Sequence, residues 1–277
     1  MNVVVSPHPY SRAFDEVAET IRCGLDQLAA TGFVLPDRDI IINAHTLPLN
    51  TRLDEQTIIY NFEQHDSPQL NEATLKLFRQ HEVWDYSPSN VTWFAERGVK
   101  AKYVPIGYAP RLSRIEHAKD PDIDVLFYGL VNDRRRKILN ELRAGGLNVC
   151  DAYALHGRAM YGAERDQLIA RSKIVLNLHY YDTGIFEIVR CAYLFANAVC
   201  VVSETSIDVP DTLTRGVYFG KRTWVDPFTL ASHETLIAHC TQLVKDPNAR
   251  RRQGLAGHVA FRDRFLELFI LQQALTT

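Results

Sequence analysis

A polar loop with a glycine joins a buried apolar run to a helix in the second half of the chain. The apolar run IVLNL (174–178) stops at HYYDTG, and a helical pattern follows over 185–197. Gly184 lets backbone amides approach a ligand closely. The free N–H groups and the positive partial charge of a helix start suit a phosphate group. The segment therefore predicts an anion site.

Glu187 and Arg190 lie on the face of this predicted helix that points away from its apolar residues. A carboxylate at Glu187 can accept hydrogen bonds from two hydroxyl groups, as a ribose presents them. It can also do no more than complement the helix dipole and pair with Arg190. On this segment alone the simpler interpretation is favoured.

A second strand end, glycine and helix start occur in YGLVNDRRRKIL (128–139), where Asn132 or Asp133 is the candidate helix cap. Four cations follow at 134–137. Cations in a first helical turn oppose the helix dipole, at a cost of roughly 0.3–1 kcal/mol each, and a bound anion reverses that cost. We expect Arg135 and Arg136 to reach such an anion. The alternative is a solvated basic face.

Candidate bases occur in the first half of the chain. His8 follows the first predicted strand, and Glu63 follows the third among other polar residues. A histidine can act as a general base near neutral pH. The alternative is that His8 only stabilises a turn through a hydrogen bond, and that Glu63 only belongs to a cluster of capping residues. His45 and Asp66 are the next candidates.

Composition bounds the class of protein. The chain has 277 residues, 46% hydrophobic and 23% charged, with a net charge of −2. This favours a soluble protein of two domains and gives no reason to expect a nucleic acid or an anionic membrane as partner. Five scattered cysteines, no signal-peptide pattern and no long apolar segment predict a cytoplasmic location, with peripheral membrane contact left open.

Strands and helices alternate along the whole chain, which predicts parallel sheets covered on both faces. We expect an N-terminal Rossmann-like domain over 1–108 and a polar linker over 109–121. A second Rossmann-like domain is expected over 122–258, with a helical tail over 259–277 that can cross back to the first domain. The predicted fold class is α/β, with the two domains facing across a cleft. No GxGxxG, GxxxxGK[ST], GxSxG or HExxH motif occurs.

Three segments together resemble the GT-B glycosyltransferases. They are KAKYVPIGY, DVLFYGLVNDRRRKIL and FEIVRCAYLFANAVCVVSE. The similarity is closest to the bacterial group with CgeB-like or "glycosyl transferases group 1" donor domains. Tyr180 stands where that family usually has an acidic residue, and Asn197 replaces a glycine.

The resemblance implies a hexosyltransferase-like enzyme with its donor in the second domain and its acceptor in the first. The donor would be a nucleotide sugar such as a UDP-sugar, and the acceptor an unknown saccharide, protein or small molecule. We expect neither a metal ion nor a cofactor. His8 and Glu63 are the expected catalytic residues. The expected donor-binding residues are Gly129, Asn132, Arg135, Arg136, His179, Thr183, Gly184, Ile185, Glu187 and Arg190. A non-catalytic protein of the same fold that binds a nucleotide sugar or a partner is one alternative, and a sugar-nucleotide epimerase is another.

Overall fold

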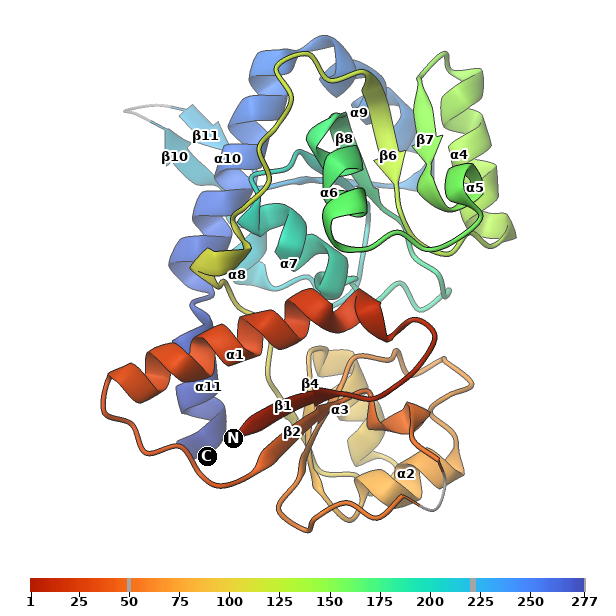
Figure 1. Ribbon diagram of the computed structural model, residues 1–277. Helices are drawn as coiled ribbons and strands as arrows, with labels where there is room; N and C mark the ends of the chain where they lie inside the picture. The colour runs from red at the N-terminus through yellow and green to blue at the C-terminus, as the bar shows by residue number, and fades with distance from the viewer. Residues whose placement is uncertain (49–50, 220–222, 277) are drawn as a thin grey trace. The chain divides into compact units, whose positions relative to one another are not determined.

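The computed structural model describes residues 1–48, 51–219 and 223–276, and the chain forms two compact units (Figure 1). Unit 1 comprises Met1–Leu112 together with the chain from Phe265 onward, and unit 2 comprises Ser113–Arg264. The division falls within the predicted linker, and the C-terminal segment belongs to the same unit as the N-terminus.

Unit 1 contains five parallel strands in the order of the sequence, β1-β2-β3-β4-β5. The strands are β1 (Asn2–Val5), β2 (Asp39–Ile42), β3 (Ile58–Asn61), β4 (Glu82–Asp85) and β5 (Ala101–Tyr103). The helices are η1 (Ser11–Phe14), α1 (Asp15–Ala30), η2 (Ala44–Thr46), α2 (Glu72–Phe78), α3 (Pro88–Ala95), η3 (Pro110–Leu112) and α11 (Glu267–Thr276).

Successive side chains of a strand point to opposite faces of the sheet, so both faces of unit 1 need cover. On one face, Ile59 and Val83 pack against apolar residues of α2 and α3, such as Leu75 and Phe94. Helices α1 and α11, the first and last helices of the chain, lie side by side in the same unit (Figure 1).

Unit 2 contains five parallel strands in the order β12-β9-β8-β6-β7 and a separate antiparallel pair, β10 and β11. The strands are β6 (Ile123–Phe127), β7 (Val149–Asp151), β8 (Ser172–Asn177), β9 (Val201–Glu204), β10 (Val217–Phe219), β11 (Thr223–Val225) and β12 (Thr229–Ala231). The helices are α4 (Asp133–Ala144), α5 (Ala152–His156), α6 (Gly162–Ala170), α7 (Ile188–Ala196), α8 (Asp211–Thr214), α9 (His233–Lys245) and α10 (Pro247–Arg264).

The order of strands in unit 2 reverses between β6 and β8. From β6 the chain goes first to β7 on one side and then back to β8 on the other. Such a reversal opens a crevice beyond the carboxyl ends of the two central strands, and ligands of open parallel sheets bind there.

Three predicted element boundaries are wrong. The helix expected over 185–197 begins at Ile188, because Ile185 is buried and pairs with Ile207 as extended backbone. The apolar spacing of 229–245 predicts a helix over that whole range, but β12 occupies its start and pairs with β9. The run LNVCDAYAL predicts a strand over 147–155, but the strand ends at Asp151, whose side chain caps α5.

In the described part of the chain, no helix is long and apolar enough to cross a membrane.

Candidate functional site

The carboxyl edge of the unit 2 sheet gathers charged side chains from three strand ends. Asn132 caps α4 by accepting a hydrogen bond from the Arg135 N–H over 3.0 Å, so the helix starts just beyond β6. The Asn132 amide also donates to the Tyr180 carbonyl over 2.9 Å. These two bonds hold the segment after β6 against the segment after β8.

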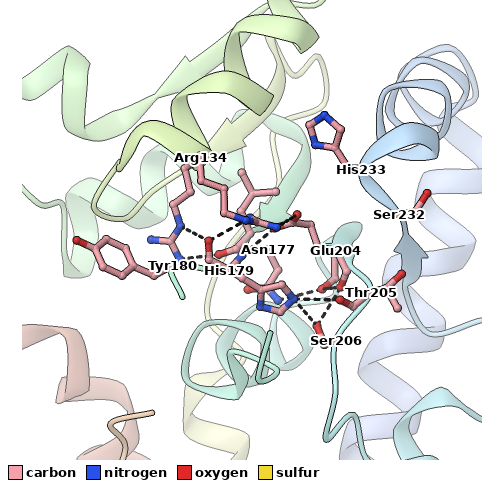
Figure 2. A network of polar contacts seen from close by, with 12 residues as sticks. Arg134, Asn177, His179, Tyr180, Glu204, Thr205, Ser206, Ser232 and His233 are labelled. Carbon is pink, nitrogen blue, oxygen red and sulfur yellow. Dashed lines mark hydrogen bonds and ion pairs between the residues drawn. The ribbon is translucent and has the colours of Figure 1, made fainter. Parts of the chain in front are cut away.

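Arg134 lies in the first turn of α4 and reaches the end of β9 (Figure 2). Its two terminal nitrogens donate to the two carboxylate oxygens of Glu204 over 2.8 and 2.6 Å. Glu204 is buried and also accepts the backbone N–H of His179 over 2.9 Å. The paired carboxylate raises the pKa of Arg134. Because the Arg134 side chain is 37% exposed, it is the cation of this edge most open to a ligand.

Arg135 is buried and ties the strand-end segments together. It donates to the carbonyls of Leu130, Leu178 and His179 over 2.6–3.1 Å, and to Glu187 over 2.6 Å. Burial lowers the pKa of Arg135 to about 10, against the opposing effect of Glu187. Arg135 therefore holds the protein scaffold and stays cationic at neutral pH.

Glu187 lies at the N-terminal end of α7 between two guanidiniums. One carboxylate oxygen accepts from Arg135, and the other lies 3.0 Å from Arg190 Nη2. Burial favours the neutral acid, but the two arginines outweigh it and lower the pKa of Glu187. Arg190 also donates to Asn177 at the end of β8 over 2.7 Å. The simpler interpretation, in which Glu187 pairs with Arg190, thus describes its contacts in this structure.

Glycine is needed at both positions of the predicted anion site, for a different structural reason at each. A Cβ on Gly129 would lie 3.1 Å from Arg190 Nη2 and 3.3 Å from the Phe127 ring, so glycine makes room for the guanidinium. Gly184 has φ +67°, a backbone conformation that other residues rarely adopt. Its carbonyl accepts the Ile207 N–H over 3.0 Å, which fixes the loop after β8 to the segment after β9.

We call Arg134, Arg135, Arg190, Glu187 and Glu204 the arginine cluster. Among its members, three guanidiniums face two carboxylates, and the carboxylate of Asp182 also acts on Arg134. The partly exposed guanidinium of Arg134, beside the start of α4, favours binding of an anion at this edge.

His179 lies at the same edge, beside Gly184. Its Nε2 lies 3.0 Å from the Ser206 hydroxyl and 3.2 Å from the Thr205 carbonyl (Figure 2). The Ser206 hydroxyl donates to the Glu204 carbonyl, so the proton of the imidazole belongs on Nε2. Its Nδ1 is then a buried acceptor without a partner in the described chain.

Several predicted site residues meet here, and others do not. Gly129, Asn132, Arg135, His179, Gly184, Glu187 and Arg190 all lie at this edge. Arg136 instead is exposed on the outer face of α4, 4.0 Å from Asp133. Ile185 is fully buried, and Thr183 is partly exposed in the loop after β8. Sequence reasoning missed Arg134, although it lies in the noted run of cations, and Glu204, the one charged residue of VCVVSE.

Unit 1 places other chemistry at the carboxyl edge of its sheet. Glu63 follows β3, and its carboxylate lies 3.9 Å from Nε2 of His45, which follows β2. Burial, and then the nearby His8, lower the pKa of His45 to about 4, so this imidazole is uncharged at neutral pH. His8 itself is exposed after β1 and accepts the Tyr10 N–H over 3.2 Å. We call His8, His45 and Glu63 the histidine–glutamate cluster.

Unpartnered polar atoms surround this second cluster. Asn43 Oδ1, His45 Nδ1 and Gln64 Oε1 are buried without a hydrogen-bond partner in the described chain. Asn43 also has φ 57°, which is uncommon outside glycine. Each unpartnered buried group costs about 1–3 kcal/mol. Asp66, the remaining candidate base, is exposed.

Within the described residues, no three histidine, cysteine, aspartate or glutamate side chains form a possible metal site. The sequence does contain DxD triplets, at 37–39, 120–122 and 122–124. Asp122 and Asp124 lie at the amino end of β6, where they pair with Arg171 and Lys173. They are at the sheet edge opposite the arginine cluster.

Curated relatives cover part of the chain. Uncharacterized protein L140 of Acanthamoeba polyphaga mimivirus is 28% identical over 155 residues, which are 54% of this chain and 49% of that protein. Uncharacterized protein L138 of the same virus is 36% identical over 87 residues, 31% of this chain and 9% of that protein. The chain thus spans half or less of the relatives that it matches. No protein-family model matches it, so the narrower CgeB-like grouping stays a prediction.

Solved structures show the fold. Anabaena HepE in complex with UDP and glucose has a TM-score of 0.57 and 13% identity, over 97% of this chain and 83% of that one. T4 phage BGT in complex with UDP-glucose has a TM-score of 0.54 and 11% identity, and the match covers 99% of this chain and 98% of that one. TarM has a TM-score of 0.58 and 10% identity, and the match covers 86% of this chain and 54% of that one. These neighbours are GT-B glycosyltransferases, which confirms the predicted fold class of two Rossmann-like domains.

Proposed function

We infer that the chain is a glycosyltransferase that moves a sugar from a nucleotide-sugar donor to an acceptor hydroxyl. One observation carries the inference: the arginine cluster and two helix starts converge at the switch point of the unit 2 sheet. The likeness to glycosyltransferases, two of them with UDP or UDP-glucose, supports a UDP-sugar as donor.

The donor diphosphate binds beside Arg134 and the start of α4. As the bond from sugar to phosphate breaks, negative charge grows on the diphosphate, and a preorganised guanidinium stabilises that charge. Arg135 keeps the loops after β6 and β8 in place. Each carboxylate oxygen of Glu187 has a further lone pair beyond its contact with an arginine, so this residue keeps the capacity to accept from a ribose hydroxyl.

The acceptor hydroxyl is deprotonated by the histidine–glutamate cluster of unit 1, with His8 as the favoured base and Glu63 as the second candidate. His8 is exposed and so can meet a substrate, whereas His45 is buried. The reaction proceeds without a metal ion, because arginine and helix starts neutralise the leaving diphosphate.

A panel of nucleotide sugars tests this function, with release of free nucleoside diphosphate as the readout. Turnover that is strongly reduced by Arg134→Ala and unaffected by Lys137→Ala, an exposed cation of the same helix, supports a glycosyltransferase. Binding of nucleotide sugars without release points to a non-catalytic binding protein. Interconversion of the sugars without release points to an epimerase, and either result overturns the proposal.

A further inference from the structure

A groove of about 670 Å³ lies in unit 2, away from the arginine cluster. Thr229, the first residue of β12, lines it, and so does Gln253 of α10, whose amide donates to the Val201 carbonyl at the start of β9 over 2.9 Å. The groove is therefore at the amino edge of the sheet. The arginine cluster is at the carboxyl edge, so the two sites are separate.

Trp224 forms part of the groove and is 52% exposed. A Cβ on Gly216 would lie 2.2 Å from the indole nitrogen, so only a glycine leaves room for the ring in this position. Tyr218, 67% exposed, packs edge-on against the indole with ring centroids 4.7 Å apart. A tryptophan that is held in place and yet half exposed offers a flat apolar surface to a ligand.

The rest of the lining decides the class of ligand. Thr229 and His239 add polar groups, while Asp226 and Arg252 carry opposite charges that cancel. An anion would meet the carboxylate of Asp226, and a lipid chain would bury polar groups without partners. A neutral saccharide meets neither obstacle, because a sugar ring has an apolar face for the indole and hydroxyl groups for the polar rim. The volume is in the usual range for small-ligand sites, roughly 300–1,000 Å³.

We propose that this groove is a second saccharide-binding site, which takes a neutral oligosaccharide with one sugar ring stacked on Trp224. The site holds a carbohydrate chain at the amino edge of the unit 2 sheet, away from the proposed donor site at the carboxyl edge. It goes beyond the proposed transfer reaction and does not depend on it, since binding can be measured without turnover.

Saturation-transfer NMR on the full chain tests the site, with maltoheptaose, cellohexaose, xylohexaose and chitopentaose as neutral probes and a heparin oligosaccharide as the anionic one. At least one neutral probe is expected to bind. Trp224→Ala is expected to weaken that binding at least fivefold, in the range that loss of an aromatic stacking platform causes. Trp224→Phe keeps a ring and retains most of the affinity, and Arg252→Ala weakens binding less than Trp224→Ala.

Phe269→Ala is the matched control, because Phe269 is an exposed aromatic of unit 1 and is 58% exposed. Thermal unfolding shows whether each variant is folded, and Trp224→Leu, which removes the ring but keeps an apolar side chain, replaces Trp224→Ala in the test if that variant does not fold. The proposal is overturned if no neutral probe binds the wild type, if only heparin binds, or if a folded variant without the ring binds like the wild type. Nucleotide binding that is unchanged in these variants shows that the proposed donor site is intact.

Discussion

The carboxyl edge of the unit 2 sheet carries three guanidiniums paired with carboxylates, whereas the same edge of unit 1 carries an uncharged imidazole, a carboxylate and amide oxygens without partners in the described chain. Both edges end five parallel strands. Under the proposed function, this difference in side chains follows from the ligands. Guanidiniums suit the diphosphate of a donor, and neutral or acidic groups suit an acceptor hydroxyl and its proton.

The two sheets also differ in topology. Unit 2 reverses its strand order between β6 and β8, while the described strands of unit 1 follow one another in sequence order. A reversal creates a crevice in which a ligand can lie between loops. The proposed donor would thus lie in the crevice of unit 2, and unit 1 offers side chains along an open edge.

The largest expected effect concerns the base in unit 1. His8→Ala or Glu63→Ala is expected to lower turnover by about 10²–10⁴-fold, the usual contribution of a general base. Donor affinity should stay nearly constant, because the donor binds unit 2. Turnover at saturating donor and calorimetric titration of the donor measure the two quantities. Wild-type turnover in both variants would contradict the division of roles between the units.

The next effect concerns stability, and it comes from unit 1 alone. Glu267 of α11 is buried, with its carboxylate 2.6 Å from the Gly107 N–H, and burial raises its pKa to about 8. The unfolded chain loses this proton near the ordinary pKa of 4.5. Between these values the unfolded state binds fewer protons, so the free energy of unfolding falls as pH rises towards 8.

Glu267→Gln removes this dependence and keeps an oxygen for Gly107. The variant is therefore expected to be more stable than the wild type at pH 8 by an amount on the order of 4 kcal/mol, and nearly equal to it at pH 4. Urea unfolding of both proteins at the two pH values measures the difference. A constant difference across pH would show that Glu267 is not the titrating group.

A smaller effect is expected at the arginine cluster. Arg134→Ala should weaken binding of a nucleoside diphosphate by roughly 1.5–3 kcal/mol, the range for hydrogen bonds to charged groups. Lys137→Ala, one turn along the same helix, should leave the affinity unchanged. Calorimetric titrations of both variants decide this, and equal affinities would remove Arg134 from the donor site.

The smallest expected effect is none at all. Excess EDTA should leave turnover unchanged, because the donor diphosphate is neutralised by arginine and helix starts. A turnover assay with and without chelator measures this. Activity that is lost with EDTA and restored by magnesium or manganese would contradict a metal-independent reaction.

Much of the scaffold could be predicted from the sequence. Alternating apolar runs and amphipathic segments gave the strands and helices of both units, and Asn132 and Gly184 marked strand-end loops correctly. Short elements could not be predicted this way. The three residues of β12 are a strand only because β9 lies beside them, and pairing with a distant strand leaves no local pattern.

The partners within the site were also beyond sequence reasoning. Which cation of 134–137 reaches the sheet depends on the residue at which α4 starts, and a shift of one or two positions turns a side chain to another face. In the sequence, Glu204 is only the last residue of an apolar strand. Its pairing with Arg134 follows from the adjacency of β8 and β9, which the sequence does not show.

Hydrogen–deuterium exchange tests the central claim, that unit 2 binds the donor nucleotide at its carboxyl edge. The full chain is compared alone and with saturating UDP, and then with GDP, ADP, CDP and dTDP. We expect at least one nucleotide to protect the segments 128–136, 177–187 and 203–207 while segments 6–10 and 43–66 exchange as before. Protection confined to the unit 1 segments, or none with any of the five nucleotides, would contradict the account.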